Sequence, residues 1–248
     1  MPALETPLVA PHVRLSVVIS AYNEEEALPL LFSELLEELR GWTSLEVIIV
    51  NDGSLDQTAE VMETLKGSAE LATRPEVRLV LCSLDSNQGM GAALQAGYRL
   101  ASEPWVTFLP GDGQIAPAMI PPLCDAVKRG ARVVTTRYTN RQYTPYRKLL
   151  SRGLRGLSRL IIGLHVTSEG MYLIERDLLN AMPLFSDSFM LNLEIPIRAA
   201  KAQVAMETVG IEVRPRQGGV SSATQLGRVF STLLDLIALR WRMSRERS

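Results

Sequence analysis

The chain has 248 residues, of which 46% are hydrophobic, and a formal net charge of −1. The length suits one large α/β domain, or at most two small ones, with an ample core. We expect no membrane span and no signal peptide, because no apolar stretch has the required length or flanking residues. Cys82 and Cys124 have no metal or disulfide spacing, so we expect two core thiols in a cytoplasmic protein.

Strands and helices alternate over the first 130 residues. Apolar runs predict strands over residues 14–20, 45–51, 77–83 and 105–109. Helical patterns follow the first three strands, over about residues 24–40, 56–74 and 87–102, and Asn23 with Glu26 predicts a capping box for the first helix. This alternation predicts a parallel sheet with right-handed crossovers.

The second half of the chain has a different pattern. A strand is expected over residues 132–137 and another over 204–213. Residues 150–164 predict a basic amphipathic helix, whose basic face is either solvated or in contact with a membrane. A last helix over residues 226–241 has an apolar face, which either packs in the core or contacts a membrane, and a basic tail.

Charge is distributed unevenly along the chain. Residues 126–168 contain no Asp or Glu but carry ten Lys or Arg residues. Such a segment indicates an anionic partner, which can be a phosphate, an anionic lipid or a nucleic acid. Nucleic acid is disfavoured, because the segment has few aromatic residues and no recognisable binding module.

Polar clusters follow three of the predicted strands, at Tyr22–Glu24, Asp52–Ser54 and Gly111–Gln114. The carboxyl ends of parallel strands lie along one edge of a sheet, where α/β proteins bind ligands. Carboxylates there can accept hydrogen bonds from a nucleobase or ribose, or ligate a divalent cation. The segment Asn87–Gly91 opens a helix and can bring backbone amides near a ligand, although Leu94 replaces the third glycine of a dinucleotide fingerprint.

Four segments together resemble one family. ISAYNEEEALPLL, VIIVNDGSLDQT, NQGMGAALQAG and DGQIAP, in this order and spacing, are similar to family 2 glycosyltransferases of the GT-A fold. The most similar branch is that of the dolichol-phosphate mannose synthase-like enzymes, which transfer a sugar from a nucleotide-sugar to a polyprenyl phosphate with inversion. The resemblance implies a Rossmann-like, mostly parallel central sheet flanked by helices, with amphipathic C-terminal helices. It further implies one domain over residues 1–248, with a donor half at 14–130 and an acceptor half at 131–248.

The resemblance assigns site residues by position. It implies a nucleotide pocket formed by Tyr22, Asn23, Glu24, Asp52, Ser54, Asn87 and Asp112. It implies an acceptor-phosphate site formed by Arg137, Arg147, Ser151, Arg216 and Ser221. Asp112, Arg137 and Arg216 are then the expected catalytic residues, with Asp112 and Gln114 as ligands of Mg²⁺ or Mn²⁺.

The metal motif departs from the family pattern. The family usually has Asp-x-Asp-x-Gln, and Pro110 stands here in place of the first Asp. One protein carboxylate and the diphosphate oxygens can still hold Mg²⁺ or Mn²⁺, which often keep several waters. The dependence of this protein on a metal is therefore left open.

A second departure concerns the general base. Family 2 enzymes that act on hydroxyl acceptors usually carry a Glu-Asp pair just before a helix, and Asn192 stands at the position of the base here. An amide does not accept a proton usefully at neutral pH. A phosphate monoester, with a second pKa of about 6, arrives largely ionised and needs Arg residues rather than a base. Glu194 is expected to pair with Arg198, with a catalytic role as the alternative.

These observations predict an inverting glycosyltransferase that uses a UDP- or GDP-sugar and a polyprenyl phosphate. We expect it to be peripheral on the inner membrane face, with a second copy or a membrane protein as its partner. One rival is a glycosyltransferase with a hydroxyl acceptor, which would need Glu194 as its base. The other rival is a catalytically weak nucleotide-sugar-binding protein, which the loss of an Asp at Pro110 would explain.

Overall fold

The computed structural model describes residues 13–140, 168–188, 190–216, 239 and 241–242. Three predicted site residues, Arg147, Ser151 and Ser221, lie outside the described residues. The helix predicted over 150–164 and most of the helix predicted over 226–241 also lie outside them. None of the helices within the described ranges has the length and apolar character needed to cross a bilayer.

The described part of the chain forms a mixed sheet in the order β3-β2-β1-β4-β6-β5-β7. The strands are β1 (Leu15–Ala21), β2 (Leu45–Asn51), β3 (Val77–Ser83), β4 (Trp105–Pro110), β5 (Val133–Tyr138), β6 (Tyr172–Glu175) and β7 (Met206–Ile211). Strand β6 is antiparallel to β4 and β5, whereas the other neighbours are parallel. The predicted, mostly parallel sheet is confirmed, and β1, β2, β4 and β5 end at the same edge.

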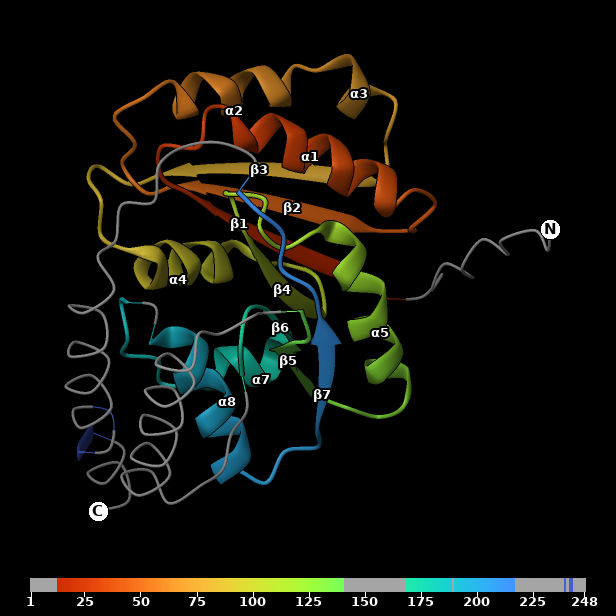
Figure 1. Ribbon diagram of the computed structural model, residues 1–248, viewed down its shortest axis with the longest axis vertical. Coiled ribbons are helices and arrows are strands. Elements are labelled where there is room, and N and C mark those ends of the chain that lie inside the picture. Colours follow the sequence, from red (N-terminus) through yellow and green to blue (C-terminus); the bar gives the residue numbers. More distant parts are fainter. Residues whose placement is uncertain (1–12, 141–167, 189, 217–238, 240, 243–248) are drawn as a thin grey trace.

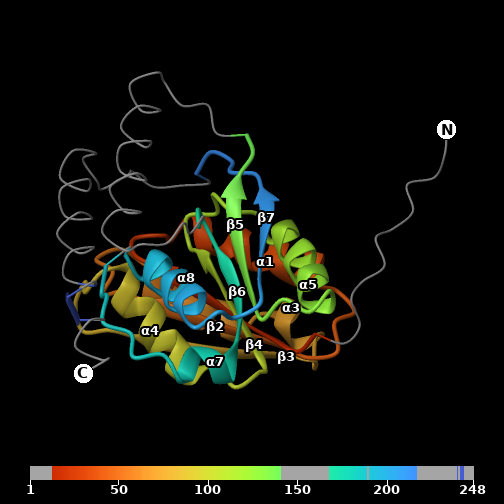
Figure 2. The ribbon, with the colours of Figure 1, turned by 90° about the horizontal axis from the view of Figure 1, so that it is seen from below.

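Helices cover both faces of the sheet. They are α1 (Ala27–Glu38), α2 (Thr58–Lys66), α3 (Ala69–Ala72), α4 (Met90–Leu100), the 3-10 helix η1 (Pro117–Met119), α5 (Ile120–Lys128), α7 (Arg176–Asn180) and α8 (Leu191–Lys201). Figures 1 and 2 show α1 and α5 on one face and α4 and α8 on the other. This two-sided cover explains why every residue of β2 is buried and why its sequence is a continuous apolar run.

Helix α4 packs unusually close to the sheet. A Cβ placed on Gly97 would stand 2.3 Å from Cγ1 of Val18 on β1. Only a glycine at this position lets the helix axis approach the strand so closely. The approach fixes α4 beneath β1 and β2, and so fixes the position of its N-terminal turn at the carboxyl edge of the sheet.

Two sequence predictions about local structure need correction. The capping box is wrong, because α1 has Glu26 at its N-cap with no side-chain hydrogen bond. Asn23 adopts a left-handed φ of 55°, and its Oδ1 accepts from the N–H of Leu55 at 2.8 Å instead. Strand β6 was not predicted, because its four residues, directly followed by α7, form too short an apolar run.

The predicted core thiols are confirmed. Cys124 is fully buried on α5, and burial raises the pKa of its thiol to about 12. Cys82 on β3 is half-buried and packs against the same core. A thiol with a raised pKa is a poor nucleophile, so Cys124 acts as a small apolar group.

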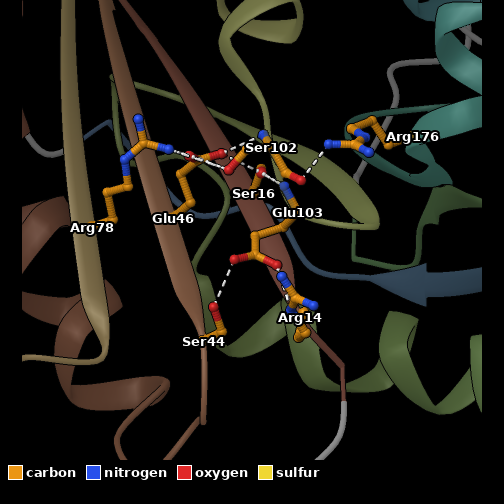
Figure 3. Close-up of polar contacts among 8 residues, drawn as sticks. All are labelled: Arg14, Ser16, Ser44, Glu46, Arg78, Ser102, Glu103 and Arg176. Carbon is orange, nitrogen blue, oxygen red and sulfur yellow. Dashed lines mark hydrogen bonds and ion pairs between the residues drawn. The ribbon is translucent and has the colours of Figure 1, made fainter.

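The amino edge of the sheet, opposite the predicted site, is held by buried carboxylates (Figure 3). Glu46 on β2 is 1% exposed and accepts four hydrogen bonds. Its donors are the hydroxyl of Ser16 (2.6 Å), the N–H and hydroxyl of Ser102 (2.8 Å each) and Nη1 of Arg78 (2.7 Å). These contacts join β1, β2, β3 and the segment that enters β4.

Glu103 repeats this arrangement next to Glu46. Its carboxylate accepts from Nε of Arg14 at 2.8 Å and from the hydroxyl of Ser44 at 2.6 Å. Its own N–H donates to the hydroxyl of Ser16 at 3.1 Å, which links the two carboxylates through one serine. Every oxygen of both carboxylates therefore has a partner, and this edge is built for stability.

Replacing Glu46 by Ala should lower the free energy of unfolding by about 3 kcal/mol, because buried donors and a guanidinium lose their shared acceptor. Urea unfolding followed by circular dichroism measures the loss. The control is Glu37→Ala, which removes an exposed ion pair with Arg40 and should change little. Equal losses in both variants would contradict the role given to the buried carboxylate.

Candidate active site

The loops after β1 and β2 are tied to each other at the carboxyl edge. The hydroxyl of Ser54 accepts from the N–H of Asn23 at 3.0 Å, and the N–H of Ser54 donates to Oδ1 of Asn51 at 2.9 Å. Gly53 has a φ of 65°, and a Cβ there would stand 2.4 Å from the backbone carbonyl carbon of Ser86. Asn23 and Ser54, both predicted to bind a nucleotide, thus also hold the walls of the predicted pocket together.

Asp52 binds the two residues that precede α4. Its Oδ1 accepts from the N–H of Gln88 at 2.8 Å and its Oδ2 from the N–H of Gly89 at 2.9 Å. The side chain is 3% exposed. The sequence indicated that this segment can bring backbone amides near a ligand, and the N–H groups of Gln88 and Gly89 donate to Asp52. Asn87 remains exposed at the start of the same turn.

A second loop, residues 185–188, packs against the other side of this turn. The carbonyl of Asp187 accepts from the N–H of Ala92 at 3.1 Å. The loop lies directly against Gly91, because a Cβ at Gly91 would stand 2.4 Å from the carbonyl oxygen of Ser188. A pocket of about 400 Å³ opens here, lined by Gln88, Gly89, Phe185, Ser186, Asp187, Ser188, Leu239 and Arg242.

Glu24 and Asp112 face one guanidinium. Oε1 of Glu24 accepts a hydrogen bond from Nη2 of Arg216, whose Nη1 lies 3.8 Å from Oδ2 of Asp112. These residues come from the ends of β1 and β4 and from the segment after β7. The structure therefore brings together three residues predicted for the site, which lie far apart in the sequence.

The Glu24 carboxyl is held in an unusual state. It is 7% exposed, and its Oε2 is buried without a hydrogen-bond partner among the described residues. Burial raises the pKa of Glu24 to about 7, Arg216 opposes this, and the carboxylates of Asp112 and Asp56 add to it. A carboxyl with a pKa near neutrality and a free oxygen is available to a ligand as acceptor or, when protonated, as donor.

The turn after β4 presents Asp112. Oδ1 of Asp112 accepts from the N–H of Gln114 at 3.0 Å, and the carbonyl of Gly113 accepts from Nε of Arg214 at 2.6 Å. Arg214 also forms a two-point ion pair with Glu34, at 2.9 and 2.5 Å. These contacts of Arg214 anchor the turn to α1, and no sequence motif predicted them.

The donor set for a metal ion is sparse. Within the described ranges, no three His, Cys, Asp or Glu side chains gather as a metal cluster. Asp112 retains lone pairs, and Glu24 has an unpaired oxygen close by. The two carboxylates already converge on a cation, Arg216, so this position fits a positive charge. A divalent ion here would depend on oxygens from its ligand, as Mg²⁺ often does.

The remaining predicted residues lie at the same edge. Tyr22 follows β1 and is half-buried. The side chain of Arg137, near the end of β5, is exposed and makes no hydrogen bond or ion pair with another residue in the described ranges. Its neighbours are fixed to the segment before β6, because the N–H of Glu169 donates to the carbonyl of Thr136 at 2.7 Å and the N–H of Tyr138 donates to Glu169 at 3.1 Å.

The first turn of α8 has no free carboxylate. Asn192 is 3% exposed, and neither polar atom of its side chain has a hydrogen-bond partner. Glu194 is 0% exposed and accepts from Nε of Arg198 at 2.9 Å, which confirms the predicted pair. Glu194 also accepts from backbone N–H groups of the 185–188 loop. Both oxygens of Glu194 already accept hydrogen bonds, so the carboxylate is poorly suited to take a proton from a substrate.

Replacing Glu24 by Gln should change the pH dependence of stability. The pKa of about 7 in the folded chain exceeds the ordinary 4.5, so the contribution of Glu24 to stability is complete below 4.5 and is lost as the pH rises to 7. The variant does not titrate, so its stability relative to wild type should rise across this window by about 1–3 kcal/mol. Urea unfolding between about pH 5 and about pH 8 measures it. A constant difference would contradict the raised pKa.

Comparison with solved structures identifies the fold. Glucosyl-3-phosphoglycerate synthase from Mycobacterium tuberculosis, in complex with Mn²⁺, UDP and glucosyl-3-phosphoglycerate, matches 92% of this chain and 78% of its own, with a TM-score of 0.66 and 21% identity. The same synthase with Mg²⁺ and UDP matches with a TM-score of 0.66. The expected GT-A fold is therefore confirmed.

Sequence relatives carry one name, undecaprenyl-phosphate 4-deoxy-4-formamido-L-arabinose transferase. That of Photorhabdus laumondii is 36% identical over 56% of this chain and 41% of its own length. The Pectobacterium carotovorum protein is 35% identical over 67% of this chain and 50% of its own length. The Edwardsiella ictaluri protein is 31% identical over 79% of this chain and 63% of its own length. The chain thus spans about half the length of the first of these relatives. Residues 16–190 match the family Glycosyl transferase family 2, and the chain belongs to that family.

Proposed function

We propose that the protein is an inverting glycosyltransferase that moves a sugar from a UDP- or GDP-sugar to a polyprenyl phosphate at a membrane surface. Family membership and the GT-A fold support the nucleotide-sugar donor. The names of the relatives support a polyprenyl phosphate acceptor. The observation that carries the acceptor class is the first turn of α8, where Asn192 replaces a base and Glu194 is fully bonded.

The donor would bind along the ends of β1, β2 and β4. Tyr22, Glu24 and Asp52, with Asn23, Ser54 and Asn87 around them, form the proposed nucleotide pocket. Asp112, with Gln114, would hold Mg²⁺ or Mn²⁺, and such an ion neutralises the negative charge that develops on a diphosphate leaving group. Arg216 is bound to Glu24 and lies beside Asp112, so it can turn to the diphosphate without crossing the site.

The acceptor phosphate would act as its own nucleophile. Its second pKa of about 6 leaves it largely ionised at neutral pH, so no group must remove a proton. Arg137 and Arg216, with Arg147, Ser151 and Ser221, would hold it in line with the anomeric carbon. Attack from the face opposite the diphosphate inverts the configuration of that carbon. The role of this chain is therefore to position two anions and to offset their repulsion.

The basic stretch supports contact with an anionic surface. Residues 126–168 carry ten cationic and no acidic side chains, and they surround the proposed acceptor site in sequence. We propose that the protein sits on the inner membrane face as a peripheral protein. A second copy or a membrane protein remains the proposed partner.

A screen of UDP- and GDP-sugars tests the acceptor class. Polyprenyl phosphate should give a glycolipid with one of the donors, whereas the matching polyprenol should give none, because neither Asn192 nor the fully bonded Glu194 can activate a hydroxyl. Each pair is run with Mg²⁺, with Mn²⁺ and with a chelator, and products are separated by thin-layer chromatography. A product from the polyprenol would favour a hydroxyl acceptor, and nucleotide binding without any product would favour the catalytically weak binding protein.

Replacing Arg216 by Ala should lower kcat by about 100-fold, because a cation beside the leaving diphosphate is lost. The matched control is Arg40→Ala, which removes an exposed ion pair with Glu37 on α1, outside the basic stretch, and should leave the rate unchanged. Steady-state kinetics with the donor found in the screen gives both values. An Arg216→Ala variant with the rate of wild type would remove Arg216 from the proposed mechanism.

A further inference from the structure

Glu194 joins α8 to the loop of residues 185–188. Its carboxylate accepts from the N–H of Phe185 at 3.2 Å, from the N–H of Ser186 at 2.9 Å and from Nε of Arg198 at 2.9 Å. The guanidinium of Arg198 also lies 5.3 Å from the centre of the Phe185 ring. The charge of Glu194 is thus balanced on its own helix, and its lone pairs hold the loop. We call these contacts the Glu194 bridge.

The loop held by the bridge is bonded in turn to α4. The carbonyl of Asp187 accepts from the N–H of Ala92 at 3.1 Å. Nε2 of Gln95 donates to the carbonyl of Ser186 and to Oδ1 of Asp187, both at 3.1 Å. The loop therefore lies between α8 and α4, as expected for two helices on the same face of the sheet (Figures 1 and 2).

Asp52 holds the same helical turn from the opposite side. The first N–H groups of a helix lack partners within it. Around the start of α4, the N–H groups of Gln88 and Gly89 donate to the carboxylate of Asp52, whereas the N–H of Ala92 donates to the carbonyl of Asp187. The turn is clamped between the sheet and the loop, so the orientation of Asp52 and the position of Asp187 depend on each other.

The clamp also shapes the pocket of about 400 Å³. One wall is the turn at Gln88 and Gly89, and another is the loop of residues 185–188. Phe185 lies between two guanidiniums there, with that of Arg242 5.2 Å from its ring centre. Glu194 fixes the backbone of Phe185 and Ser186, so it sets the distance between the two walls.

We propose that Glu194 is a positioning residue for donor binding, which acts through the 185–188 loop and α4 on Asp52. This inference rests on the proposed function, because it takes Asp52 to contact the nucleotide. Replacing the Glu194 carboxylate leaves the part-buried N–H groups of Phe185 and Ser186 short of an acceptor and removes the carboxylate from Nε of Arg198. The loop then shifts to find other partners, α4 loses the acceptor of Ala92, and Asp52 loses its fixed orientation.

The test compares two buried carboxylates at opposite edges of the sheet. Glu194→Gln and Glu46→Gln both remove a buried charge that accepts several hydrogen bonds, and both should lower the free energy of unfolding. Only Glu194→Gln should weaken nucleotide binding, by about tenfold in Kd, because only Glu194 is connected to Asp52. Titration calorimetry of the full chain with UDP and with GDP gives the Kd of whichever nucleotide the wild type binds.

A second variant approaches the bridge from α4. Gln95→Met keeps the length of a half-buried side chain but removes its hydrogen bonds to Ser186 and Asp187. It should weaken nucleotide binding in the same direction as Glu194→Gln, by severalfold, with little loss of stability. This variant answers the question even where Glu194→Gln fails to fold.

The outcomes are distinct. An unchanged Kd in Gln95→Met and in Glu194→Gln would overturn the positioning role. A normal Kd with a collapsed kcat and loss of the acidic limb of the pH profile in Glu194→Gln would also overturn it, by showing a general base. Wild-type protein that binds neither UDP nor GDP would overturn the proposed function itself, a result visible before any variant is made.

Discussion

The hydrogen bonds from the Gln88 and Gly89 amides to Asp52 fix the position of α4 against the end of β2. A buried carboxylate that accepts two backbone N–H groups at a helix start is stabilised by those bonds and by the helix dipole. The bonds align the loops after β2 and β3 at one edge of the sheet. The loop of residues 185–188 then packs on the same turn, so the position of this loop depends on Asp52 as well.

The buried carboxylates at the two edges of the sheet differ in how many of their oxygens accept hydrogen bonds. At the amino edge, Glu46 and Glu103 have partners on every oxygen, and a buried network of this kind is rigid and stabilising. Among the described residues, Glu24 at the carboxyl edge has an oxygen without a hydrogen-bond partner, and the side-chain amide of Asn192 has none either. Nε of Arg176, beside Ser102 at the amino edge, is also unpaired. The unpaired oxygen of Glu24 therefore supports the proposed site only together with its position beside Asp112 and Arg216.

Strands β1, β2, β4 and β5 were predictable because a strand buried on both faces needs an apolar run, which a sequence shows directly. The pair of Glu194 and Arg198 was predictable because residues four apart share a helix face. The contact between Glu24 and Arg216 was not, because 192 positions separate them and only the completed sheet brings them together. The capping box failed because Asn23 bonds to Leu55, a partner that exists only once β1 and β2 are paired.

The close seating of α4 at Gly97 limits how this site can respond to a ligand. A helix seated that deeply against Val18 cannot slide along the sheet without lifting away from it. Adjustment at the N-terminal end must therefore come from fraying or tightening of the first turn, while the rest of the helix stays in place. Affinity at the carboxyl edge and stability of the whole sheet become separable properties. Substitutions of the exposed Asn87 or Gln88 can then alter the proposed nucleotide pocket while the core that holds the turn remains the same.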